Sequence, residues 1–77
     1  METRSSLPKI NIKATGENIK RLREQRNISV KALSEMLDLT IIAVYSWQSG
    51  RSLPTVENLV ALSSIFDVGM NEILVVE

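Results

Sequence analysis

The sequence predicts an all-α domain of five short helices. Apolar residues recur at three- and four-residue spacings in successive segments, as they do along the buried face of a helix. Residues that favour helix N-caps stand ahead of these segments, and only short turns separate one segment from the next. Seventy-seven residues with 44% hydrophobic side chains suffice for one small hydrophobic core, so we expect a single folded domain.

The first predicted helix begins after Thr15, a good N-cap, and runs to about Arg26. Ile19 and Leu22 fall three residues apart, which places both side chains on one face of the helix. Asn27 tolerates the left-handed conformation in which many helices end, so we expect this helix to stop there.

The two ends of the chain carry weaker signals. Residues 1–8 are polar and end in a proline, and we expect a flexible N-terminal segment ahead of a single domain over residues 9–77. Lys9–Lys13 alternates polar and apolar residues, a pattern typical of a β-strand. This segment and residues 74–77 could pair into a short two-stranded ribbon.

Two further helices follow with only a tight turn between them. Ser29 and Thr40 are their N-caps, Asp38 tolerates the left-handed conformation that the turn needs, and Gly50 ends the second helix. Ser34 is small, as a close approach of two helices requires. On helices that cross near a right angle, five apolar side chains would point inward together: Leu33, Leu37, Leu39, Val44 and Trp47. This pattern is typical of a helix-turn-helix.

The carboxy-terminal third predicts the last two helices. Thr55 caps a segment in which Leu59, Leu62 and Phe66 form an apolar stripe. Residues 69–77 favour one more short helix, whose last residues could leave it as a strand. Five short helices joined by tight loops make an all-α domain.

The composition argues against several classes of function. The sequence has no cysteine and no histidine, so we expect neither a disulfide nor a metal site. It has no glycine-rich phosphate loop and no serine in a nucleophile context, so we expect neither an enzyme nor a cofactor or small-molecule site. No apolar run reaches the length that spans a bilayer, and no signal peptide is visible, so we expect no membrane partner and a cytoplasmic protein.

Charge is unevenly distributed along a chain whose net charge is zero. Residues 1–38 carry eight Lys and Arg against five Asp and Glu, a balance of +3. Residues 39–77 carry one Arg against four Asp and Glu, a balance of −3. The asymmetry suggests one basic face, although chance placement of solvated charges would explain it as well.

Five segments in register resemble the Cro/repressor-type (XRE) helix-turn-helix family over about residues 14–75. The matching segments read TGENIKRLREQRNIS, LSEMLDLT, VYSWQSGRSLP, TVENLVALSSIF and MNEIL. The resemblance implies five helices, with the third placed in the major groove of double-stranded DNA. It also implies a sequence-specific transcriptional regulator, most simply a repressor.

The resemblance assigns roles to individual positions of this chain. The base-facing residues would be Ile41, Ile42, Tyr45 and Ser46. The residues that meet the phosphate backbone would be Ser29, Val30, Lys31, Thr40, Ser49 and Arg51. Exposed backbone N–H groups at the starts of the second and third helices suit phosphates, and Arg51 supplies a positive charge.

The chain departs from the family pattern at three places. Val30 stands where the family usually has Gln, and it cannot bond a phosphate. Arg23 would meet the neutral Gln48, where the family often pairs an Arg with a Glu. The base-facing positions lack Arg, Lys, Asn and Gln, so the usual bidentate contacts to guanine and adenine are missing.

The neighbouring pair Ile41 and Ile42 allows two interpretations. If both side chains remain exposed, they form a contact surface, and in a major groove they could meet only the C5-methyl of thymine. The other interpretation is that the protein itself covers them. The same pair, with the zero net charge, favours the competing function of a protein-interaction module or antitoxin-like adaptor that uses the same fold.

A single small domain makes few base contacts, so specific binding would require a homodimer on a two-fold site. The apolar residues near the carboxy terminus are the candidate dimer surface: Met70, Ile73, Leu74, Val75 and Val76. The alternative is that these residues simply close the core of one chain.

Overall fold

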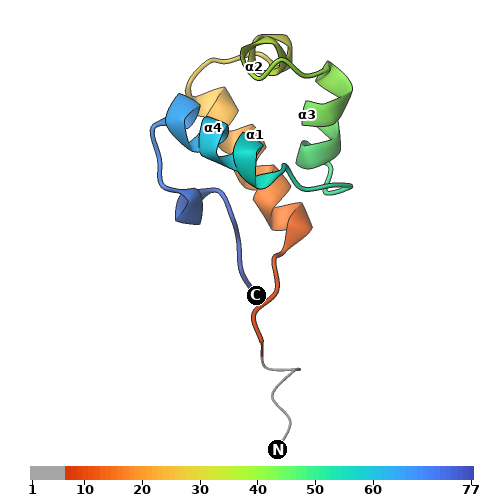
Figure 1. The fold of residues 1–77 in the computed structure, drawn as a ribbon, viewed down its shortest axis with the longest axis vertical. Coiled ribbons are helices and arrows are strands. Elements are labelled where there is room, and N and C mark those ends of the chain that lie inside the picture. The colour runs from red at the N-terminus through yellow and green to blue at the C-terminus, as the bar shows by residue number, and fades with distance from the viewer. Residues whose placement is uncertain (1–6) are drawn as a thin grey trace, which may run out of the picture.

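The structure is a computed structural model that describes residues 7–77. Its helices follow the order α1 (Ile12–Gln25), α2 (Val30–Met36), α3 (Ile41–Gln48), α4 (Val56–Phe66) and the 3-10 turn η2 (Met70–Glu72). In Figure 1, α2 lies across the top, α3 stands at the right, and the carboxy-terminal segment returns beside the start of α1. The predicted all-α fold is confirmed, with a single 3-10 turn in place of the fifth helix.

In the stretch that the structure covers, no helix combines the length and the apolar character needed to cross a membrane.

Helix α1 begins three residues before the predicted N-cap. The side chain of Asn11 accepts a hydrogen bond from the backbone N of Ala14 at 2.9 Å and is the N-cap. Thr15 lies inside the helix and is fully buried, and its Oγ1 accepts a hydrogen bond from the backbone N of Val75 at 3.0 Å. The predicted cap at Thr15 is therefore wrong, because Asn11 caps equally well and frees that hydroxyl for the carboxy-terminal segment.

The predicted ribbon is reduced to one antiparallel bridge between Ile10 and Val76. Two backbone hydrogen bonds flank it, from Asn11 N to Val75 O at 2.7 Å and from Glu77 N to Lys9 O at 2.8 Å. Since α1 starts at residue 12, the second half of the predicted strand belongs to a helix. Most of the predicted flexible segment, residues 1–6, lies outside the described residues.

The predicted caps and turns of the middle helices are confirmed. Ser29, Thr40 and Thr55 each cap their helix, with side chains that accept from the backbone N three residues later. Asn27 and Asp38 adopt φ values of 56° and 57°, in the left-handed region expected of them. Asp67 adopts φ 56° and ends α4, a feature that the sequence did not reveal.

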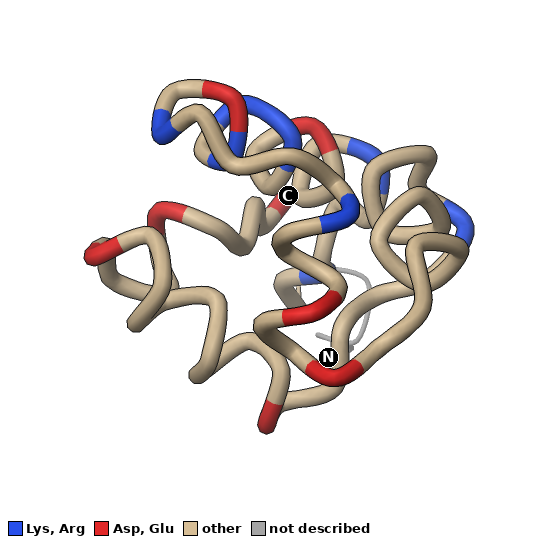
Figure 2. The backbone as a smooth tube through the Cα atoms, turned by 90° about the horizontal axis from the view of Figure 1, so that it is seen from above, with Lys and Arg blue, Asp and Glu red and all other residues tan. Residues whose placement is uncertain are grey.

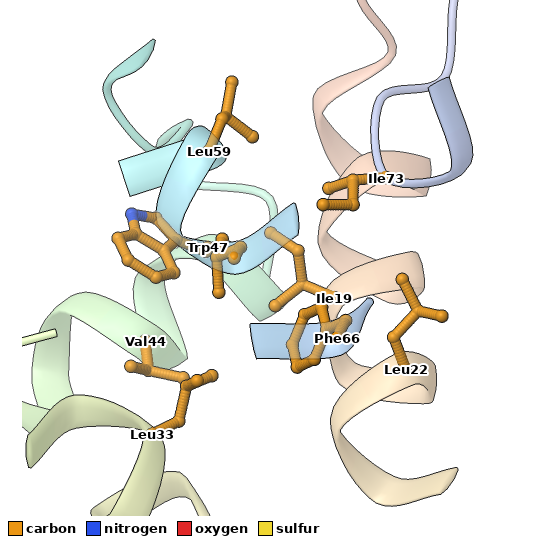
Figure 3. Close-up of a cluster of buried hydrophobic side chains, with 9 residues drawn as sticks. Ile19, Leu22, Leu33, Val44, Trp47, Leu59, Phe66 and Ile73 are labelled. Carbon is orange, nitrogen blue, oxygen red and sulfur yellow. The ribbon is translucent and has the colours of Figure 1, made fainter. Parts of the chain in front are cut away.

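The hydrophobic core draws on every helix (Figure 3). Leu33, Val44 and Trp47 are buried as predicted, while Leu37 and Leu39 are half-buried and pack against the same core. Figure 3 shows the Trp47 ring close to Leu59 and the Val44 side chain close to Leu33. The other buried members are Ile19, Leu22, Leu62, Phe66 and Ile73.

Gly16 allows α1 to touch the backbone of α3. A Cβ atom built on Gly16 would lie 2.0 Å from the carbonyl oxygen of Trp47, far inside any possible contact distance. The residue itself is buried. Any side chain at this position would push the two helices apart, and with them the packing of Trp47 in the core.

We expect Gly16→Ala to lower the free energy of unfolding by roughly 1–3 kcal/mol, the usual range for overpacking. Helix propensity alone would favour alanine by about 1 kcal/mol, so the sign of the change separates the two effects. Urea unfolding followed by Trp47 fluorescence measures it.

Gly69→Ala is the matched control. Its new Cβ would meet only the end of the Asn71 side chain, at 2.5 Å, and that side chain can rotate away. The control should change stability little, and a Gly16→Ala chain at least as stable as the wild type would contradict the close helix contact.

Candidate nucleic-acid interface

The turn between α2 and α3 is fixed by local hydrogen bonds. The backbone N of Leu39 donates to Ser34 O at 2.8 Å, and Asp38 takes the left-handed conformation between them. Ser34 is almost fully buried, and its Oγ donates to Lys31 O at 2.7 Å. Because the turn is short and bonded throughout, it holds the orientation of α3 relative to α2.

Helix α3 has an inner face and an outer face. Val44 and Trp47 are buried in the core, whereas Ile41, Ile42 and Tyr45 are 47%, 73% and 54% exposed. The prediction that these three side chains remain outside is confirmed, and the interpretation that the chain covers the isoleucines is wrong. The surface of residues 7–77 holds no pocket.

The polar side chains of α3 are bonded within the chain. Ser46 Oγ lies 2.8 Å from Ser52 Oγ, across the turn at Gly50. Ser49 Oγ donates to Ser46 O at 3.2 Å, and Thr40 Oγ1 accepts from the backbone N of Ala43 at 3.3 Å. Ser46, predicted to face a base, is only half exposed. The outer face of α3 is therefore dominated by apolar surface.

Arg23 anchors the far end of α3 to α1. Its Nε donates to Gln48 Oε1 at 2.9 Å and its Nη1 donates to Ile28 O at 2.8 Å, so the expected contact with Gln48 is formed. The residue is 9% exposed. Its Nη2 also lies 3.8 Å from a carboxylate oxygen of the exposed Glu24.

The residues predicted to meet phosphate differ in charge, in exposure and in the hydrogen bonds that they already make. Lys31 and Arg51 are exposed, and neither forms an ion pair with another described residue. Ser29 is exposed, but its hydroxyl already accepts from the backbone N of Ala32 at 3.0 Å. The half-buried side chain of Val30 packs against the core, and as expected from the sequence it has no group that could bond a phosphate. Only the backbone amide of Val30 could meet a phosphate.

Charges of opposite sign separate in space only in part. Figure 2 shows most Lys and Arg in the upper part of the view, where some Asp and Glu lie among them, while the lower edge carries Asp and Glu. A basic side of this kind favours approach of an anionic partner in one orientation.

The candidate dimer residues do not form one exposed surface. Ile73 is fully buried in the core of the single chain, so its assignment to a dimer surface is wrong. Met70, Leu74 and Val75 are half-buried, and only Val76 is well exposed, at 58%. The alternative that part of this segment closes the monomer core is therefore correct for Ile73.

Several contacts that position this interface gave no signal in the sequence. Ser52, which bonds Ser46, follows a glycine turn whose geometry brings the two hydroxyls together. Asn18 Nδ2 donates to Ile73 O at 3.2 Å, and Arg26 Nε donates to Phe66 O at 2.6 Å. The first contact spans a turn, and the other two join residues 40 or more positions apart. Helical periodicity relates only residues within one helix, so it cannot predict them.

Comparison with known families matches residues 19–73 to a family model described as helix-turn-helix. The chain belongs to this XRE-type helix-turn-helix family. Among individual relatives of this helix-turn-helix protein, the HTH-type transcriptional activator BcrR of Enterococcus faecalis is 33% identical over 58 residues. The match covers 75% of this chain but only 28% of BcrR, so the chain spans little more than a quarter of that relative.

Solved structures agree with the helix-turn-helix fold. The restriction-modification controller protein C.AhdI from Aeromonas hydrophila superposes with a TM-score of 0.74 at 19% identity, covering 82% of this chain and 96% of that one. The DNA-binding domain of BldD superposes with a TM-score of 0.71 at 24% identity, covering 83% of this chain and 93% of that one. The BldD domain from S. venezulae gives the same score and identity and covers 96% of its own chain.

We expect Gln48→Glu to raise the free energy of unfolding by about 0.5–1 kcal/mol, because hydrogen bonds between charged groups are stronger than those with a neutral partner. Because Arg23 would hold the pKa of the new carboxylate below its ordinary value, the gain should shrink as pH falls below about 4 and vanish only once that carboxylate is protonated. Urea unfolding at neutral and acid pH measures both effects.

Gln48→Ala is the control, and it should lower stability because Arg23 Nε loses its acceptor. If Gln48→Glu matched the wild type at neutral pH while Gln48→Ala was destabilised, a neutral acceptor would be sufficient for Arg23.

Proposed function

We propose that this chain is a transcriptional regulator that binds double-stranded DNA by placing α3 in the major groove. The observation that carries the proposal is the two-sided α3: Val44 and Trp47 fix it in the core, while Ile41, Ile42 and Tyr45 face outward. An α-helix fits the major groove in this manner. Resemblance to the transcriptional activator BcrR and to the DNA-binding domain of BldD supports the proposal.

The phosphate contacts in this proposal come from both ends of the helix-turn-helix. Lys31 in the first turn of α2 and Arg51 after α3 would supply positive charge, and both are exposed. Thr40 and Ser49 flank α3 and would lie near the backbone with them, together with Ser29. Ser46, although bonded to Ser52, would border the base edges beside Tyr45.

We further propose that the regulator acts as a repressor. A domain bound at a promoter excludes polymerase by occupancy, and this action requires no further contact surface. BcrR is named an activator, so the sign of regulation is open to direct test with a reporter gene. Deletion of the gene that encodes this chain should raise expression from the promoter that the chain binds.

The direct test of DNA binding uses the DNA upstream of the protein's own gene. Fluorescence anisotropy should show that this duplex binds at least tens of times more tightly than a random duplex of equal length, since specific sites commonly exceed non-specific ones by about a thousandfold or more. Equal affinity for both duplexes would remove the proposal of sequence-specific regulation at that site.

A protein-interaction module is the competing proposal, and the 73% exposure of Ile42 favours it. A large exposed apolar side chain beside another is typical of a surface that binds a protein. Two results together would support this proposal. The chain would bind no duplex more tightly than a random duplex, and Ile42→Ala would abolish binding to a defined protein partner.

Arg51→Ala should weaken binding about equally on specific and random duplexes, because a phosphate contact carries no sequence information. The slope of log K against log salt concentration should flatten by about 0.9. Arg21→Ala is the matched control, since Arg21 bonds Asn18 on the side of α1 that meets Ile73, and it should leave the slope unchanged. A loss confined to one sequence would show that Arg51 reads a base.

A homodimer on a two-fold site completes the proposal, with Met70, Leu74, Val75 and Val76 at its interface. Support comes from the exposure of Val76 at 58% next to the half-buried members of the segment. We expect a dimer by sedimentation at micromolar concentration, and a monomer for Val76→Asp. Val76→Asp is preferred to a change at Ile73, which would unfold the core.

Met36→Asp is the control for the dimer, because Met36 is also 58% exposed but belongs to α2 at the opposite end of the molecule from the carboxy terminus (Figure 1). It should sediment as the wild type does. A wild type that is monomeric both alone and on DNA would remove the dimer from the proposal.

A further inference from the structure

The outer face of α3 offers a base pair almost nothing except apolar contact. Ile41 and Ile42 are 47% and 73% exposed, and neither side chain has a hydrogen-bond donor or acceptor. Both are β-branched residues in the first turn of a helix, so their χ1 angles are restricted before any partner arrives. Burying them against a partner therefore sacrifices little side-chain entropy.

The polar side chains that could compete with this apolar contact each already make one hydrogen bond within the chain. Ser46 Oγ is 2.8 Å from Ser52 Oγ, and Gln48 Oε1 accepts from Arg23 Nε at 2.9 Å. Thr40 Oγ1 accepts from the backbone N of Ala43. Besides the donors that Thr40 and Gln48 retain, the Tyr45 hydroxyl, on a side chain that is 54% exposed, is the group on this face for hydrogen-bond readout.

We propose that this face recognises the C5-methyl group of pyrimidines in general, so that 5-methylcytosine in the DNA strengthens binding as thymine does. The inference rests on the proposed function, in which α3 enters the major groove. Thymine displays its C5-methyl in that groove, and this is the base feature that apolar side chains contact there. Cytosine methylated at C5 displays the same group from the same ring position.

The methylation state of cytosine changes only this one feature of the groove. A methylated C·G pair keeps the N4 amino donor of cytosine and the N7 and O6 acceptors of guanine. A protein that reads base edges by bidentate hydrogen bonds meets the same donors and acceptors in both forms. The outer face of α3 instead depends on apolar contact, so the added methyl changes its affinity directly.

The expected change in affinity follows from the apolar surface of one methyl group that is buried on binding. Each buried methyl should change affinity about fourfold. If two half-sites of a dimer each present one such methyl, the combined change should be about fifteenfold. Changes of this size are well resolved by anisotropy titration.

The experiment starts from the duplex that binds the full-length wild-type chain most tightly after selection from a random-sequence pool. Thymines are replaced by uracil one at a time to find the positions where loss of the methyl weakens binding. At each such position the T·A pair is then replaced by C·G and by 5-methylcytosine·G. We expect the affinity ratio of methylated to unmethylated cytosine to be about fourfold, equal to that of thymine to uracil.

The Ile41→Ala, Ile42→Ala double variant links the effect to the proposed side chains. Both methyl ratios should fall towards one in this variant, even though its overall affinity also falls. The matched control is Val56→Ala, Val60→Ala, which removes similar apolar surface from α4, where these residues are 72% and 55% exposed. The control should keep both ratios at the wild-type value.

The outcomes separate this inference from the proposed function. If selection yields no duplex that binds above the random level, the proposed function itself fails. If a duplex is selected but methylated and unmethylated cytosine bind equally, the inference is overturned and the regulator remains. A ratio that survives in the Ile41→Ala, Ile42→Ala variant would also overturn it, because the methyl would then be read elsewhere.

Discussion

The close contact between α1 and α3 at Gly16 is the constraint on which the rest of the structure depends. The carbonyl oxygen of Trp47 lies where a Cβ atom on residue 16 would have to be, so the backbones of α1 and α3 touch. This contact holds the Trp47 side chain in the core beside Leu59. Because one side of this eight-residue helix is fixed against the core, its opposite side must face outward. The exposure of Ile41 and Ile42 is therefore a consequence of packing elsewhere, which explains how a helix apolar around most of its circumference remains at the surface.

Polar side chains of α1 and its C-cap also form hydrogen bonds with backbone groups that have no partner within a helix. Thr15 and Asn18 bond backbone groups of the carboxy-terminal segment, and Arg23 and Arg26 bond carbonyls at Ile28 and Phe66. Each of these side chains supplies a group that a short helix end or an extended segment lacks. A domain of this size has a small core, so contacts that satisfy buried backbone groups carry a substantial share of its stability.

Local chemistry explains which features could be predicted from the sequence. The caps at Ser29, Thr40 and Thr55 and the left-handed Asp38 depend on residues within four positions, and the structure has them as expected. The start of α1 was misplaced because Thr15 is also a good cap, and only its distant partner Val75 decides its role. Burial of Ile73 likewise depends on residues far along the chain, so the predicted dimer surface included one side chain that lies in the core. The exposed apolar face of α3 was correctly predicted, whereas the Ser46–Ser52 pair that limits its polar character was not.

The bridge between Ile10 and Val76 brings the two ends of the described chain side by side. Figure 1 shows this junction beside the start of α1, at the end of the molecule away from α2. A second domain, an affinity tag or a surface anchor attached at the carboxy terminus would therefore project from the end of the molecule opposite α2. Two copies joined in tandem would be held at a separation that the length and stiffness of the linker set.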